Sequence, residues 1–171
     1  MSQKEVTAQM LADPRHFLSL GFGSGLSPFA PGTAGTLAAI PVYLLMTGLD
    51  LWSYVVVTVL FFMLGVHLCS YTSRYLGVHD HGAIVWDEVV GYLLTMLLVP
   101  VTVFSVILGF IAFRLFDIWK PWPVKILDAR MKGGFGIMID DVGAAIYAGL
   151  TTHAILYFID FEMVLFGVQI H

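Results

Sequence analysis

Residues 52–70, WSYVVVTVLFFMLGVHLCS, decide the fold, because this apolar stretch carries no Asp, Glu, Lys or Arg. A helix needs about 20 apolar residues to cross a membrane, so residues 52–70 predict a membrane span. Residues 33–49 and 137–159 are the next candidate spans. Residues 84–119 are too long for one span, and Pro100 interrupts them, which predicts two helices joined in a hairpin. The sequence therefore predicts an all-α, polytopic membrane bundle of about five transmembrane helices with a tight central hairpin.

The composition is also that of a membrane protein. Of the 171 residues, 58% are hydrophobic and 12% are charged, whereas soluble domains carry about 25% charged residues. The mean hydropathy is +0.87. We expect a single membrane-embedded domain over residues 1–171, in which residues 1–20 form a polar cytoplasmic segment without the apolar core of a signal peptide. The net charge of −4 and the lack of a basic tail exclude nucleic acid as a partner, and no obligate protein partner is indicated.

The basic residues fix the expected orientation in the membrane. Cytoplasmic loops carry an excess of Lys and Arg. When the N-terminus is placed in the cytoplasm, the predicted loops at 72–83 and 120–136 are cytoplasmic as well. All 8 basic residues then lie on that face, whereas only three of the 12 acidic residues, Asp50, Asp160 and Glu162, map to the outer face. This one-sided distribution argues against a conduit through the membrane. The basic residues are Lys4, Arg15, Arg74, Arg114, Lys120, Lys125, Arg130 and Lys132.

Three stretches bring carboxylates to the predicted cytoplasmic face. They are IVWDEVVG, FRLFDIWKPWP and GGFGIMIDDVGAA, which come from three different helices. A charged side chain within a membrane segment costs roughly 2.5–3.5 kcal/mol, so these carboxylates need a compensating partner. Oxygen ligands from several helices at one depth favour a hard cation, Mg²⁺ or Mn²⁺. The candidate ligands are Asp87, Glu88, Asp117, Asp140 and Asp141.

Each group also has a simpler explanation. Asp87 and Glu88 open a helix, where the helix dipole favours negative charge. Asp117 follows Arg114 by three residues and precedes Lys120 by three, a spacing that permits salt bridges on one helix face. Adjacent helical residues point about 100° apart, so we expect only one member of each acidic pair to face the shared centre.

Phosphate-binding groups are expected beside the carboxylates. Arg114 and Lys120 can hold a phosphate by charge-assisted hydrogen bonds. Residues 21–36, GFGSGLSPFAPGTAGT, lead into the first predicted span, and the free amides at a helix N-terminus bind phosphate readily. Thr33 and Thr36 are the candidate phosphate ligands there. An ordinary membrane-entry loop is an equally good explanation of this stretch.

These stretches, together with the segment from Asp80 to Gly91, resemble the phosphatidylglycerophosphatase A family, in order and over about residues 17–150. The resemblance implies a multi-pass enzyme of the bacterial cell inner membrane with its active site on the cytoplasmic face. Such an enzyme is a phosphoric monoester hydrolase of phospholipid biosynthesis. It removes the terminal phosphate of phosphatidylglycerophosphate to give phosphatidylglycerol, with Mg²⁺ as cofactor.

The chain lacks the nucleophile motifs of two other lipid-phosphate chemistries, the histidine phosphatases and the CDP-alcohol transferases. The simplest mechanism is then attack by a water that the metal activates. The implied catalytic residues are Asp87, Glu88, Asp117 and Asp141, while Arg114 and Lys120 stabilise the phosphate oxygens. The alternatives are a proton- or ion-coupled membrane carrier that uses intramembrane carboxylates, and a non-catalytic subunit of a membrane assembly.

Overall fold

The computed structural model describes residues 5–122, 124 and 131–165, with side chains up to residue 160. Every regular element among these residues is helical, which agrees with the predicted all-α class. Two 3₁₀ helices lie near the N-terminus, and the others are α-helices. In chain order the elements are η1 (Ala8–Ala12), α1 (Pro14–Ser19), η2 (Gly21–Leu26), α2 (Pro31–Met46), α3 (Leu51–Leu76), α4 (Trp86–Thr95), α5 (Val103–Trp119) and α7 (Gly133–Leu165).

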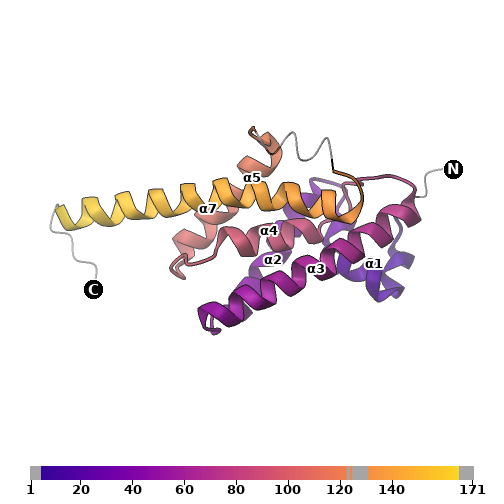
Figure 1. Cartoon of the computed structure of the whole chain (residues 1–171), viewed down its shortest axis with the longest axis horizontal. Coiled ribbons are helices and arrows are strands. Elements are labelled where there is room, and N and C mark those ends of the chain that lie inside the picture. The colour runs from indigo at the N-terminus through magenta and orange to yellow at the C-terminus, as the bar shows by residue number, and fades with distance from the viewer. Residues whose placement is uncertain (1–4, 123, 125–130, 166–171) are drawn as a thin grey trace.

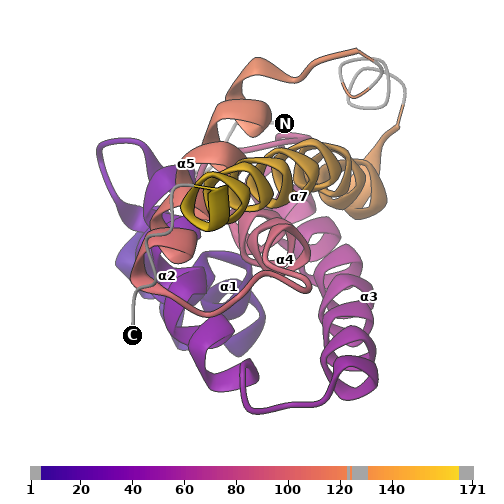
Figure 2. The same cartoon turned by 90° about the vertical axis from the view of Figure 1, so that its left-hand side faces the viewer.

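The short helix α4 forms the centre of the bundle. It packs against α2, α3, α5 and α7, and the end-on view shows it between α2, α3 and α7 (Figure 2). Val89, Val90, Tyr92 and Leu93 of α4 are fully buried. The long helix α7 extends along one side of the molecule and packs on α3, α4 and α5 (Figure 1). Side chains on α4 are therefore shielded by several other helices.

Among the residues that the structure describes, two helices are long and apolar enough to cross a membrane. They comprise Leu51–Leu76 and Gly133–Asp160. The apolar helix α2 is shorter, and the 10 residues of α4 reach only about 15 Å, half of a roughly 30 Å hydrocarbon core. Each predicted segment does contain a helix, but length and hydropathy support two spans, and the five-span arrangement stays a prediction.

The expected break at Pro100 is present between α4 and α5. Helix α5 begins with a capping box, in which Thr102 Oγ1 accepts a hydrogen bond from the Ser105 amide at 3.0 Å. The two helices then pack together, since the Tyr92 hydroxyl donates to the Val106 carbonyl at 3.1 Å. The hairpin returns the C-terminal end of α5 to the N-terminal end of α4, which brings the polar ends of both helices together.

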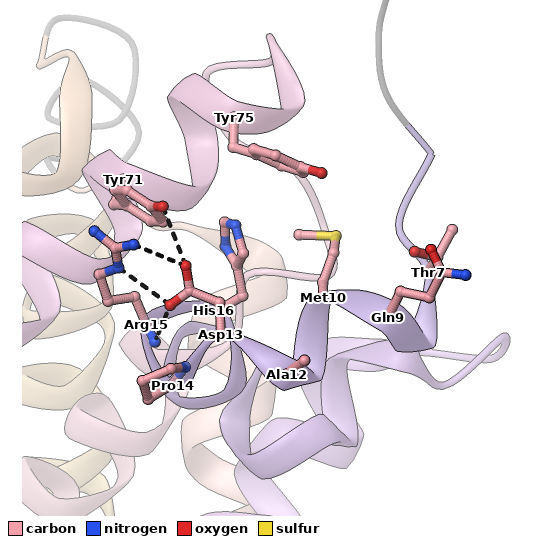
Figure 3. A pocket seen from close by; sticks show the side chains of 10 residues that line it. All are labelled: Thr7, Gln9, Met10, Ala12, Asp13, Pro14, Arg15, His16, Tyr71 and Tyr75. Atoms are coloured by element: carbon pink, nitrogen blue, oxygen red, sulfur yellow. Dashed lines mark hydrogen bonds and ion pairs between the residues drawn. The ribbon is translucent and has the colours of Figure 1, made fainter.

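The polar N-terminal segment, in its described part, is folded against the end of α3. The Arg15 side chain and the Tyr71 hydroxyl donate to Asp13 (Figure 3). His16 Nδ1 lies 3.0 Å from Thr72 Oγ1. The hydrogen bonds from the Arg15 side chain hold the pKa of Asp13 well below its ordinary value, and burial lowers the pKa of His16. A cavity of about 800 Å³ opens beside these residues and Tyr75. None of the predicted site residues lines it.

Candidate functional site

Three carboxylates meet where α4 begins. Asp87 and Glu88 lie in the first turn of α4, and Asp141 faces them from α7. One oxygen atom from each side chain lies within 4.8 Å of the corresponding oxygen atoms of the other two. We call Asp87, Glu88 and Asp141 the carboxylate cluster. The N-terminal end of α4 supplies a favourable helix dipole to its two members there.

The carboxylate cluster is buried and incompletely paired. Asp87 and Asp141 are 8% and 3% exposed. Asp87 Oδ1, Glu88 Oε2 and Asp141 Oδ2 have no hydrogen-bond partner among the described residues. Buried charged groups without a partner are strongly disfavoured. Three converging carboxylate oxygens are the donor type that Mg²⁺ prefers, so the residues present fit a divalent cation.

The two acidic pairs differ in how many of their members belong to the carboxylate cluster. Both Asp87 and Glu88 belong to the carboxylate cluster. In the second pair Asp141 joins the cluster, whereas Asp140 accepts a hydrogen bond from Lys120 Nζ at 2.5 Å. The expectation that one member of each pair faces the centre therefore describes Asp140 and Asp141 but not the first pair.

Arg114 connects the carboxylate cluster to α5. Its Nη1 atom lies 2.5 Å from Asp117 Oδ2 and 3.6 Å from Glu88 Oε1. All three side chains are largely buried, so these charges interact with little screening by water. Asp117 thus forms the salt bridge that its spacing permits, and it lies at the edge of the cluster through its contact with Arg114.

Lys120 ends α5 in a left-handed conformation with φ of 44°. Its amide donates to the Phe116 carbonyl at 2.8 Å, and its side chain reaches across to Asp140 on α7. Lys120 therefore joins the C-terminal end of α5 to the region of α7 that carries the acidic pair.

The N-terminal turn of α2 covers Arg114 and Glu88. Gly32 lies so close to them that a Cβ atom there would come within 2.9 Å of Arg114 Nη2 and closer still to Glu88 Oε1. Thr36 is buried, and its hydroxyl donates to the Gly32 carbonyl at 2.9 Å, while Thr33 is half-buried in the first turn. The first amides of a helix have no partner within the helix, so this turn presents donors close to the guanidinium of Arg114.

Sequence reasoning identified the charged residues but missed the role of Gly32. The small residues of the stretch PGTAGT were the available signal, because Gly32 and Gly35 lie on one face of α2 and both pack tightly against other elements. Gly134, at the start of α7, packs tightly against α3. A Cβ atom at Gly134 would lie within 2.8 Å of the Ser70 amide nitrogen.

Comparison with known proteins places the chain in a family. Residues 17–156 match the family model described as phosphatidylglycerophosphatase A. The chain is 49% identical over 150 residues to phosphatidylglycerophosphatase A of Escherichia coli (strain K12), covering 87% of this chain and 85% of that protein. It is 48% identical over 149 residues to phosphatidylglycerophosphatase A of Haemophilus influenzae, covering 86% and 91%. No solved structure matches the chain significantly. The chain therefore belongs to the phosphatidylglycerophosphatase A family.

Proposed function

We propose that this chain hydrolyses the terminal phosphate of phosphatidylglycerophosphate to give phosphatidylglycerol, in a Mg²⁺-dependent step of phospholipid biosynthesis. The observation that carries the proposal is the buried carboxylate cluster with Arg114 beside it. The names of the two bacterial relatives support the substrate. The comparisons do not favour a carrier.

A lipid substrate also suits the outer face of α5. A cavity of about 610 Å³ lies there. Among the described residues that line it, Arg114 is charged and the others are apolar. Such a surface can accept a hydrocarbon chain close to the guanidinium that would hold a phosphate. The apolar residues of the lining are Phe110, Ile111, Leu115, Ile118 and Trp119.

The cation would be held by the carboxylate cluster, with Asp117 and Asp140 as further candidate ligands at its edge. When bound, Mg²⁺ offsets negative charge on the phosphoryl oxygens and lowers the pKa of the attacking water. Asp87 Oδ1 and Asp141 Oδ2 have no hydrogen-bond partner among the described residues, and one of them would accept the proton of that water. The water oxygen would bond to phosphorus as the bond from phosphorus to the glycerol oxygen breaks, and the glycerol oxygen would take up the proton that the carboxylate accepted.

Arg114 and Lys120 would bind the phosphate oxygens, together with Thr33 in the first turn of α2 and Thr36 one turn further along. Charge-assisted hydrogen bonds from Arg114 are short and directional. They stabilise the charge that develops on the phosphoryl group in the transition state. Binding of the phosphate between Arg114 and the helix N-terminus of α2 would use the amides that have no partner within the helix.

The test is phosphate release by the purified protein in detergent micelles. Phosphatidylglycerophosphate with Mg²⁺ should yield inorganic phosphate and phosphatidylglycerol. The Asp141→Asn protein serves as the matched negative control. A folded parent protein that releases no phosphate would refute the proposed reaction. Ion or proton flux in proteoliposomes without phosphate release would support the carrier instead.

Gly32→Ala is expected to lower the rate of phosphate release about tenfold with little loss of stability. The added methyl group would displace Arg114 and Glu88, and small misplacements of catalytic groups are costly to rate. Both contacts are made by the ends of side chains, which can move, so the melting temperature should change little. Gly48→Ala is the control, because a Cβ atom there meets nothing within 4 Å. Equal rates for both variants would show that α2 does not position the site.

We further propose that the chain spans the bacterial inner membrane five times, with the N-terminus and the loops at 72–83 and 120–136 in the cytoplasm. Residues 125–130 of the second loop, which include Asp128, lie outside the described residues. Lys132 lies in the same loop, and the structure shows that it is exposed. It is therefore a better position for labelling than Asp128.

A single cysteine at Lys132, in a chain whose Cys69 is replaced by alanine, should react with an impermeant thiol reagent only in inverted membrane vesicles. A cysteine at Gly48, between α2 and α3, is the control and should react in intact cells. Labelling of position 132 in intact cells would overturn the proposed orientation.

A further inference from the structure

The N-terminal end of α7 is capped by side chains from another part of the chain. The Gly133 amide donates to His79 Nε2 at 2.7 Å, and the Gly134 amide donates to Ser70 Oγ at 2.8 Å. Ser70 lies on α3 and His79 in the loop that follows it. The first amides of a helix need partners from outside the helix, and α7 obtains two of them across the tertiary structure.

These contacts leave little freedom for α7 to slide along α3. The backbones touch at Gly134, where a Cβ atom would overlap the Val66 carbonyl oxygen. One turn further along α7, Met138 packs against Gly65 and Trp86. Asp141 follows Gly134 by seven residues, about two helical turns. The position of the first turn of α7 therefore sets where Asp141 meets the rest of the carboxylate cluster.

The loop that carries His79 also leads directly into α4. Ser73 Oγ donates to the carbonyl groups of Val78 and His79 at 2.8 and 2.6 Å, which fixes the beginning of the loop to α3. The Val85 amide donates to the Ser19 carbonyl at 3.0 Å, which fixes its end just before Asp87. One short segment thus contacts the first turn of α7 and positions the first turn of α4.

We propose that His79 is a positioning residue for the phosphatase site. Through the Gly133 amide it joins the start of α7, which carries Asp141, to the loop that orients Asp87 and Glu88. Ser70 acts with it by holding the Gly134 amide. His79 Nε2 must carry a lone pair for this contact, so the proton of the neutral ring lies on Nδ1. The inference rests on the proposed function, because it concerns the geometry of the same carboxylate cluster.

The decisive comparison is His79→Leu with His79→Gln. Leucine keeps most of the volume and removes the acceptor, whereas the glutamine oxygen can still reach the Gly133 amide. Loss of one hydrogen bond should lower kcat about fivefold in His79→Leu, with KM for the lipid unchanged. His79→Gln should restore most of kcat, and His79→Leu should need more Mg²⁺ for half-maximal rate.

The control is His153→Leu, a change at a histidine of α7 itself, whose Nδ1 lies 2.7 Å from the Gly149 carbonyl of its own helix. That variant should keep the parent kcat. Ser70→Ala combined with His79→Leu should cost less than the product of the two separate effects, since both residues hold the same turn.

Hydrogen exchange supplies a measurement that does not depend on activity. The Gly133 and Gly134 amides should exchange slowly in the parent protein, and Gly133 should exchange faster in His79→Leu but not in His79→Gln. The inference is overturned if His79→Leu keeps the parent kcat, or if His79→Gln is as impaired as His79→Leu. A parent protein with slow exchange at Gly133 but no phosphate release would refute the proposed function and leave the cap itself established.

Discussion

Asp141→Asn is expected to lower phosphate release roughly 100-fold while the protein still inserts into membranes and folds. The amide has the size of the carboxylate but no charge, so packing against α4 should survive. It removes one of the three buried carboxylates that converge in the cluster, and loss of a single group that stabilises the reacting charge costs about 10²–10³-fold in rate. The measurement is phosphate release per folded protein, with folding checked by the melting temperature.

The same change should be made at Asp87, Asp117 and Asp140, and Glu88 should be changed to glutamine. At least three of these five amide variants should lose most of their activity if the carboxylates hold a cation. Asp160→Asn is the matched control, because Asp160 lies on α7 far along the helix from the cluster and its side chain is exposed. Parent-like rates in all five variants would remove the carboxylates from the reaction.

Arg114→Ala is expected to lower kcat/KM for phosphatidylglycerophosphate by about 10- to 150-fold. This range corresponds to the loss of a charge-assisted contact of roughly 1.5–3 kcal/mol. Arg114→Lys keeps the charge but loses the planar fork that matches a phosphate, so it should recover only part of the rate. Lys120→Ala should also lower kcat/KM.

The stability of these variants separates binding of phosphate from structural pairing. Arg114→Ala leaves Glu88 and Asp117 without their shared partner, so its melting temperature should fall as well. If both Arg114→Ala and Lys120→Ala keep full activity, Arg114 serves only as the ion-pair partner of Glu88 and Asp117, and Lys120 only as that of Asp140.

The helices could be predicted because their signals are local. Long apolar runs predicted α3 and the apolar part of α7, and Pro100 predicted the break between α4 and α5. The carboxylates could be predicted as a group because charge is rare in such segments. The brevity of α4 was not apparent, since the apolar run continues through the turn that separates α4 from α5.

The contacts that orient the site could not be read from the sequence. Gly134 and Ser70 are 64 residues apart, and Gly133 and His79 are 54 apart. No local pattern indicates that a histidine in one loop caps a distant helix. Which of Asp140 and Asp141 faces the cluster likewise depends on the rotation of α7 against α4, which packing of the whole bundle determines.

The central claim is that hydrolysis depends on a cation held by the carboxylate cluster. The most direct measurement is phosphate release by purified parent protein after exhaustive chelation, before and after Mg²⁺ is added back. Activity should be lost on chelation and restored by Mg²⁺, and the added cation should also raise the melting temperature of the parent but not of Asp141→Asn. Full phosphate release that persists after thorough chelation would contradict the account.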